Sequence, residues 1–363
     1  MLPVTFGLAC LLTRYQGYGI STFPDEKVTP ETLFFAGGTT KAHTAAAISL
    51  LVDDNINFKN VQWSTPLSEL IPDDFVLTDG ATRIVTVEDA LSHRSGMPAH
   101  ELVEGIDNFT ALDVVRSLRH LPMSAPIGTK CQYGNLMYVA VAHALEVVTG
   151  VALGDFLQTR IWEPLGMKDT FFSLEDAQQA QSKGKVKLAN GYIWDEQQGF
   201  RKLPYVTPPA LDGAVGVISS VTDYAKWIRM MMSSSPPLSK KGHEALTSPR
   251  FIAGDFPYEI YGRTPMPGSA TSPLGWFNRH YHGEELNMHF GANIHHSFGA
   301  FVGYMPRRNF GFVIMGNGAH PGSKLGLRLI EDFLETPKAK RYDWSGRWVH
   351  TTPITEPYTL AQV

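Results

Sequence analysis

The sequence predicts an α/β fold in which an antiparallel sheet, flanked by helices, is built from both ends of the chain. Residues 3–20 have the pattern of a β-hairpin. After residue 270 the pattern becomes that of strands again, most clearly over residues 298–304 and 310–315. The region 61–212 between these ends carries mainly helical signals. We therefore expect a helical lobe inserted into an α/β lobe.

These signals divide the chain into two lobes and a tail. The α/β lobe is expected to contain residues 1–60 and 213–350, and the helical lobe residues 61–212. Residues 351–363 show little periodicity and are expected to form a tail. A cleft between two lobes is a common place for a small-molecule site.

The individual elements follow from hydrophobic spacing and from turn residues. The turn of the first hairpin is expected near Arg14 to Gly17. Helices are expected over residues 39–53, 86–92, 111–119, 137–149, 153–161, 222–232 and 325–334. Thr222 is the expected N-cap of its helix. Residues 178–212 contain several polar runs and prolines, and are expected to be loop-like.

The composition is that of a globular protein and excludes several classes of partner. Of the 363 residues, 43% are hydrophobic and 18% are charged, which is enough for a large core. The net charge is −4 and there is no basic block, so nucleic acid is not an expected partner. No apolar run reaches the ~18 residues of a membrane span. The first residues lack a basic leader, so we expect a first β-strand and a cytoplasmic protein, without a membrane partner.

The most informative stretch is Gly38-Thr39-Thr40-Lys41, at the start of the first expected helix. In an S-x-x-K motif, a serine opens a helix and a lysine follows one turn later, so that the amine reaches the hydroxyl. Here glycine stands at the serine position. Thr39 and Thr40 are rotated by about 100° and 200° from position 38. We therefore expect their hydroxyls to be structural.

Four separated segments together resemble the serine β-lactamase and penicillin-binding-protein-like superfamily. They are residues 38–41 (GTTK), 91–98 (LSHRSGMP), 126–135 (PIGTKCQYGN) and 289–291 (HFG). Their order is most similar to that of the class C β-lactamase-like esterases and transesterases, and the resemblance extends over about residues 3 to 345. It implies a β-lactamase-like fold and acyl transfer from a small-molecule acyl substrate, with no cofactor.

The resemblance also implies a role for individual residues. Position 38 corresponds to the nucleophile, and Lys41 to the group that holds or accepts its proton. Tyr133 corresponds to a second base, Asn135 to the residue that orients Lys41, and His289 to the opposite wall. The backbone N–H groups of residues 38 and 292 would form the oxyanion hole. Further wall residues are Gly291, Ala292 and Trp276, although Trp276 is as readily explained as a core residue.

Gly38 leaves three interpretations open, because no acyl-enzyme can form without a side-chain oxygen there. The chain is an acyl hydrolase or acyltransferase inactivated by replacement of the serine, a natural ligand-binding pseudoenzyme, or an enzyme that uses Lys41 and Tyr133 as a non-covalent acid and base. The first is favoured because the other motif residues keep their catalytic identities.

The remaining histidines are not expected to hold a metal. His289, His295 and His296 lack a standard ligand spacing, and no cysteines or carboxylates cluster with them. His93 is expected to make a structural hydrogen bond near Ser95.

The H-x-G segment also lacks the lysine of K-T-G, which makes a β-lactam carboxylate a less obvious substrate. We expect an ester, lactone, thioester or amide of a small, possibly polyketide-like, metabolite; the oligomeric state is not indicated.

Overall fold

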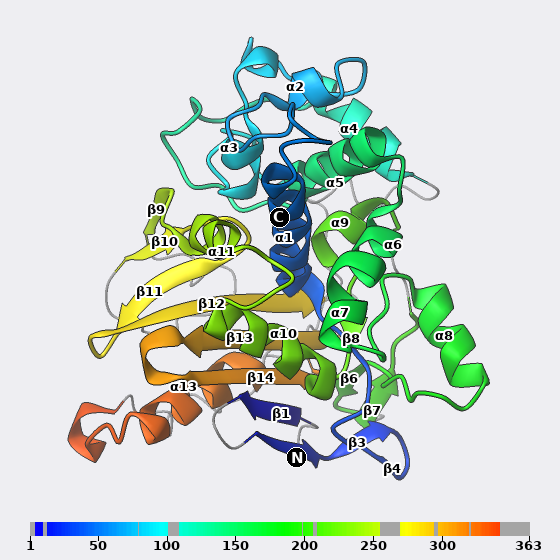
Figure 1. Ribbon diagram of the computed structural model, residues 1–363. Coiled ribbons are helices and arrows are strands. Elements are labelled where there is room, and N and C mark those ends of the chain that lie inside the picture. The colour runs from blue at the N-terminus through cyan, green and yellow to red at the C-terminus, as the bar shows by residue number, and fades with distance from the viewer. Residues whose placement is uncertain are drawn as a thin grey trace.

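An eight-stranded antiparallel sheet stands beside a group of helices from the middle of the chain (Figure 1). The structure is a computed structural model that describes residues 4–9, 13–78, 80–100, 109–197, 199–205, 209–254, 269–293, 297–318 and 321–341. The strands of the large sheet are β1 (Val4–Ala9), β2 (Arg14–Tyr18), β9 (Phe251–Gly254), β10 (Ala270–Ser272), β11 (Phe277–Tyr281), β12 (Glu284–Asn293), β13 (Phe298–Met305) and β14 (Phe310–Gly316).

The sheet is built from both ends of the chain, which confirms the predicted fold class. Its strand order is β2-β1-β14-β13-β12-β11-β10-β9, so that the N-terminal hairpin extends the C-terminal strands. Val4 on β1 pairs with Gly316 on β14. The hairpin is present, but its predicted turn is wrong because Arg14 and Gly17 lie within β2. As the edge strand of the sheet, β2 accommodates the polar and glycine residues that resemble a turn.

Helices cover the two faces of the sheet (Figure 1). Helix α10 (Val221–Ser233) packs on β1, β13 and β14, and α13 (Pro321–Phe333) packs on β13 and β14. Successive residues of β13 belong to different cores, because side chains alternate across a strand. Val302 joins the main core with α10, whereas Phe301 joins the second core with α13.

The remaining helices come mostly from the middle of the chain. They are α1 (Thr40–Asp53), α2 (Leu67–Leu70), α3 (Val87–Leu91), α4 (Ala111–Ser117), α5 (Leu136–Thr149), α6 (Leu153–Leu157), α7 (Glu163–Leu165), α8 (Leu174–Ser182), α9 (Asp212–Val215) and α11 (Lys240–Thr247), with a π-helical turn at Gln158–Trp162. Helix α1 lies between the sheet and the other helices (Figure 1), and its residues from Thr40 to Leu51 are buried. A helix that is buried all round needs small residues, which Ala45, Ala46 and Ala47 supply.

Two details differ from the sequence expectation, and two further expectations are not tested. Part of the expected loop 178–212 forms the end of α8 and a hairpin of β6 (Tyr192–Asp195) and β7 (Gly199–Lys202). The N-cap of α10 is Ser220 rather than Thr222, whose hydroxyl donates instead to the carbonyl of Pro30 at 3.1 Å. The tail 351–363 lies outside the described residues, and the lobe boundaries remain predictions.

Short elements complete the described fold. They are strands β3 (Ile20–Thr22), β4 (Glu26–Lys27), β5 (Phe34–Phe35) and β8 (Ile218–Ser219), and the 3-10 turns Gly37–Thr39, Ala81–Arg83, Leu118–His120, Pro209–Leu211, Pro306–Arg308 and Lys338–Lys340. Within the described ranges, no single helix has the length and apolar character needed to cross a membrane. The pair Leu136–Thr149 and Leu153–Leu165 meets these criteria only jointly and is bent by 78°.

A buried carboxyl group at the start of α9 should make stability depend on pH. Burial, and secondarily the charge of Glu146, raise the pKa of Asp212 from 3.8 to about 8. Folding therefore favours the protonated form, and its stabilising contribution is lost as pH rises through about 8. We expect Asp212→Asn to be more stable than the unchanged chain at pH 8.5, by roughly 2–5 kcal/mol, and the two to converge near pH 4. Urea denaturation at the two pH values measures this, with the exposed Glu175→Gln as control; equal differences at both would contradict it.

Candidate active site

The candidate site begins at the turn that leads into α1. Strand β5 ends at Phe35, and the 3-10 turn Gly37–Thr39 continues directly into α1. Gly37 has a φ of +53°, a left-handed conformation that favours glycine. A Cβ atom on Gly37 would lie only 3.1 Å from the backbone nitrogen of Ala292. The turn therefore holds position 38 close to β12.

The two threonines that follow Gly38 have structural hydrogen bonds. The hydroxyl of Thr39 donates to the carbonyl of Ala36 at 2.9 Å and accepts from the hydroxyl of Tyr224 at 2.6 Å. The hydroxyl of Thr40 accepts from the backbone N–H of Val217 at 3.1 Å. These bonds confirm that both threonine hydroxyls have structural roles.

Lys41 is the second residue of α1, one turn after Gly38, and is fully buried. Its ammonium group donates to the side-chain oxygen of Asn135 at 2.7 Å and to the carbonyl of Ala214 at 3.4 Å. It also lies 4.5 Å from the ring centre of Tyr133 and 5.4 Å from that of Tyr138. Oxygen acceptors and aromatic faces both stabilise a buried cation. The structure thus brings Lys41 together with Tyr133 and Asn135, which lie more than 90 residues later in the sequence.

The space beside Gly38 is occupied by other groups of the site. A Cβ atom at this position would lie 2.6 Å from the hydroxyl oxygen of Tyr133, 2.9 Å from the carbonyl oxygen of Phe290 and 3.3 Å from Cε1 of His289. All three distances are at or below the closest approach normal for a Cβ atom. The side chains of Tyr133 and His289 therefore converge on the nucleophile position, and the pocket closes around a glycine.

His289 stands on β12 as a buried, neutral imidazole. Its Nδ1 lies 2.6 Å from the carbonyl oxygen of Phe290, which requires Nδ1 to carry the proton and leaves a lone pair on Nε2. Within the described residues, this buried Nε2 has no hydrogen-bond partner. Burial, and secondarily the charge of Lys41, lower the pKa of His289 to about 3. At neutral pH, His289 can accept a hydrogen bond but cannot pair with a carboxylate as a lysine would.

The glycine of the H-x-G segment permits a close approach between two backbones. A Cβ atom on Gly291 would lie 1.9 Å from the carbonyl oxygen of Ala36, at the turn before α1. The adjacent Ala292 faces Gly37 across the same contact. Side chains at these glycines would force β12 away from the nucleophile turn. The contact therefore places the backbone of residues 291 and 292 beside position 38, where the sequence predicts an oxyanion hole.

His93 also belongs to this group of side chains, a place in the site that was not predicted for it from the sequence. Its ring lies 4.6 Å from the ring of Tyr133, and its backbone carbonyl accepts from the N–H of Gln132 at 2.7 Å. The expected hydrogen bond near Ser95 is not formed by its Nε2, which has no partner among the described residues. Burial, then the charges of Lys41 and His289, keep its pKa well below the ordinary value. The signal in the sequence that could have placed His93 in the site is the family-like segment LSHRSGMP, which contains it.

Three other candidates do not belong to the described site. Trp276 is 1% exposed and packs edge-on against Tyr304 in the main core. It is therefore a core residue in this structure, and its predicted place in the substrate wall is not supported. His295 and His296 lie outside the described residues. In the part of the chain that the structure describes, no three potential ligand side chains are arranged to hold a metal ion.

Comparison with known proteins extends the resemblance in sequence and in fold. A sequence model described as Beta-lactamase matches residues 12–334. Unguisins hydrolase ungD' of Aspergillus campestris is 38% identical over 347 residues, which are 93% of this chain and 62% of that protein. Unguisins hydrolase ungD of Aspergillus violaceofuscus is 38% identical in an alignment of 373 residues that covers 97% of this chain and 65% of that protein. The chain thus spans just under two thirds of the length of these relatives.

Solved structures share the fold at lower identity. The octameric penicillin-binding protein homologue from Pyrococcus abyssi superposes with a TM-score of 0.77 at 24% identity, over 92% of this chain and 73% of that one. The D-amino acid amidase from Ochrobactrum anthropi SV3 superposes with a TM-score of 0.73 at 21% identity, over 92% of both chains. The fold and the matched sequence agree: the chain belongs to the Beta-lactamase family.

Proposed function

We propose that the chain carries a beta-lactamase-type acyl hydrolase or acyltransferase site whose covalent step is disabled at Gly38. The observation that carries this proposal is the convergence of Tyr133 and His289 on position 38, together with a buried Lys41 that lies over the ring of Tyr133 and is bonded to Asn135. A site without a nucleophile has no chemical need for a buried lysine, because burial of an ammonium group is costly unless it is compensated.

A serine at position 38 would complete a known type of reaction. Its hydroxyl oxygen would attack the acyl carbon while its proton passes to Lys41 in its neutral amine form or to Tyr133 as phenolate, and the leaving group would take up that proton as the acyl-enzyme forms. Water or another acceptor would then remove the acyl group. The backbone N–H groups of residues 38 and 292 would stabilise the oxyanion. Gly38 retains its backbone N–H, so only the nucleophile is missing from this scheme.

The substrate we propose is a small, uncharged metabolite bearing an amide or ester bond. Neutral His289 accepts hydrogen bonds and gives no cation for a substrate carboxylate. The two fungal relatives carry the name unguisins hydrolase, which makes unguisins the first metabolites to test. A polyketide-like ester remains the second class of candidate.

Intact-mass spectrometry with activated p-nitrophenyl esters tests the disabled step. We expect Gly38→Ser to gain the mass of one acyl group and to release p-nitrophenolate, while the unchanged chain and Gly38→Ala do neither. The alanine variant is the matched control, because it meets the same crowding from Tyr133 without supplying an oxygen. If all three proteins stay unmodified with esters and with unguisins, the disabled-enzyme proposal is wrong.

A second candidate function is that of a natural ligand-binding protein, and one observation favours it. The hydroxyl of Tyr133 lies 2.6 Å from the position that a Cβ atom would occupy, so the pocket fits glycine more closely than serine. This candidate predicts that the unchanged chain binds an unguisin without hydrolysing it, and that Gly38→Ser weakens binding. Turnover by the unchanged chain without an adduct would instead support non-covalent catalysis by Lys41 and Tyr133.

A further inference from the structure

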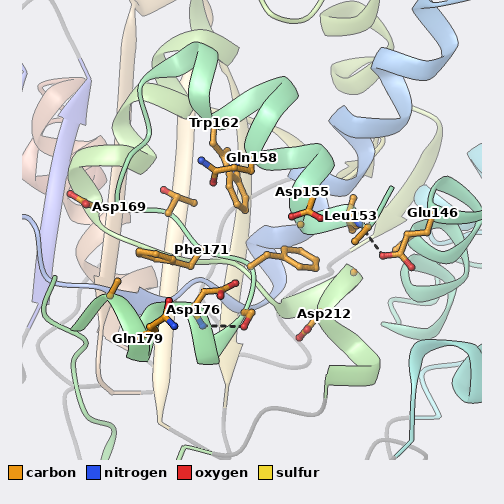
Figure 2. A pocket seen from close by; sticks show the side chains of 18 of the residues that line it. Glu146, Leu153, Asp155, Gln158, Trp162, Asp169, Phe171, Asp176, Gln179 and Asp212 are labelled. Atoms are coloured by element: carbon orange, nitrogen blue, oxygen red, sulfur yellow. Dashed lines mark hydrogen bonds between the residues drawn. The ribbon is translucent and has the colours of Figure 1, made fainter. Parts of the chain in front are cut away.

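A cavity of about 700 Å³ lies outside the candidate active site, among α5, α6, α8 and α9 (Figure 2). Its wall contains none of the residues that surround position 38. The volume lies within the range of cavities that hold small organic molecules. Nothing in the acyl-transfer proposal uses this space.

Besides Asp169, which follows α7, four carboxyl groups from four different helices border the cavity. They are Glu146 on α5, Asp155 on α6, Asp176 on α8 and Asp212 on α9, all labelled in Figure 2. Asp155 and Asp176 are exposed and stand at the surface, whereas Glu146 and Asp212 are partly buried. One oxygen of Glu146 accepts from the backbone N–H of Leu153 at 2.9 Å.

Asp212 is the carboxyl group that the protein leaves unmatched. Among the described residues its side chain forms no hydrogen bond and no ion pair, and the charged group that acts on its pKa is Glu146, which is of the same sign. Two carboxyl groups in one poorly solvated space repel each other unless a proton or a cation lies between them. The cavity therefore has an inner end that favours positive charge.

The opposite part of the wall is aromatic. Phe171 and Phe172 line the cavity, and Phe172 packs directly on α6, where a Cβ atom added to Gly154 would lie 3.0 Å from Cβ and 3.1 Å from the ring atom Cδ1 of Phe172. Aromatic faces attract organic cations and bury their apolar parts. Three lysines line the cavity, Lys168, Lys183 and Lys185, and all are exposed, so water and salt screen their charge.

The geometry points to a second binding site, at the inner end of this cavity, for a small organic cation: a primary amine with an aromatic or aliphatic body. Its ammonium group would lie between Asp212 and Glu146, and its apolar part against Phe171 and Phe172. A bound ammonium would return Asp212 to its ionised form. A metal ion fits less well, because no three ligand side chains in the described residues are arranged for one.

The cavity borders the elements that hold Lys41. Helix α9 begins at Asp212, and its next two carbonyls accept from Thr44 at 2.6 Å and from Lys41 at 3.4 Å. Gly213 packs so closely on α5 that an added Cβ atom would lie 2.5 Å from Cβ of Ala142. An occupant beside Asp212 would therefore press on the segment that contacts Lys41, without entering the space around Gly38.

Calorimetric titration of the unchanged chain with 2-phenylethylamine tests this site directly, and needs no activity at Gly38. The neutral analogue 2-phenylethanol serves as the ligand control, and pH 8.5 keeps the amine largely charged while Asp212 is ionised. We expect the amine to bind at one site and at least tenfold more tightly than the alcohol. Equal affinities, or no binding of the amine at 10 mM, would overturn the proposal.

Variants locate the binding. Asp212→Asn and Glu146→Gln should each weaken binding of the amine at least tenfold, because each removes one carboxylate without changing side-chain shape. Glu175→Gln is the matched control: it removes an exposed carboxylate from α8 that does not line the cavity, and should change the affinity less than twofold. Near-UV circular dichroism shows whether each variant is folded. If folded Asp212→Asn and Glu146→Gln both bind like the unchanged chain, the amine does not occupy this cavity.

Discussion

Replacing Gly291 by alanine should lower the free energy of unfolding by about 3 kcal/mol or more. The added Cβ atom would lie 1.9 Å from the carbonyl oxygen and 2.9 Å from the carbonyl carbon of Ala36, and 3.3 Å from Cβ of Ala300. Two of these atoms are backbone, so no side-chain rotation relieves the contact. Urea denaturation of the variant and the unchanged chain measures the difference.

Gly283→Ala is the matched control for this prediction. Gly283 precedes β12 with a φ of +84°, but an added Cβ atom would meet nothing within 4 Å. Its replacement costs only the strain of a left-handed backbone, about 1 kcal/mol. A loss for Gly291→Ala no greater than that for Gly283→Ala would show that β12 and the nucleophile turn are not in close contact. Gly291→Ala should also weaken ligand binding at position 38, because it moves β12 away from the turn before α1.

In a Gly38→Ser background, Lys41→Met should slow acylation by p-nitrophenyl esters about 10³-fold. Methionine has a similar length but cannot accept the proton of the serine hydroxyl. The substitution also removes the hydrogen bond of 2.7 Å from Lys41 to the side-chain oxygen of Asn135. The rate of appearance of the acyl adduct by mass spectrometry gives the comparison.

The control for the lysine is Lys187→Met in the same background. Lys187 is exposed, and its ammonium group pairs with Glu26 at 3.0 Å rather than with a residue of the site. It should leave the acylation rate unchanged within a factor of two. Acylation of the Lys41→Met protein within tenfold of its parent would mean that Lys41 does not act on the nucleophile, and would leave Tyr133 as the base.

The fold was largely predictable because its signals are local. Alternating strands at both ends and the buried helix over residues 40–53 appear in short windows of sequence. Edge strand β2 was misplaced because polar and glycine residues suit both an edge strand and a turn. The β6–β7 hairpin was missed for a related reason, since its polar and proline-rich surroundings resemble a loop.

The members of the site were predictable from motif order, but their spacing was not. No short window shows that the hydroxyl of Tyr133 reaches the nucleophile position, or that His93 packs against the ring of Tyr133. Both contacts depend on how the loop before α5, which carries Tyr133, lies against the turn before α1 and against the segment after α3. The unmatched carboxyl of Asp212 was equally invisible, because its surroundings come from four helices separated in sequence.

Mapping an acyl group on Gly38→Ser most directly tests the central claim that the site is complete except for its nucleophile. The variant is treated with a p-nitrophenyl ester, digested with pepsin at low pH and sequenced by tandem mass spectrometry. We predict one acyl group, attached at position 38, and none in the Gly38→Ala digest. An adduct at another residue, or no adduct in a folded variant, would contradict the claim that Lys41, Tyr133 and Asn135 form a working acyl-transfer site.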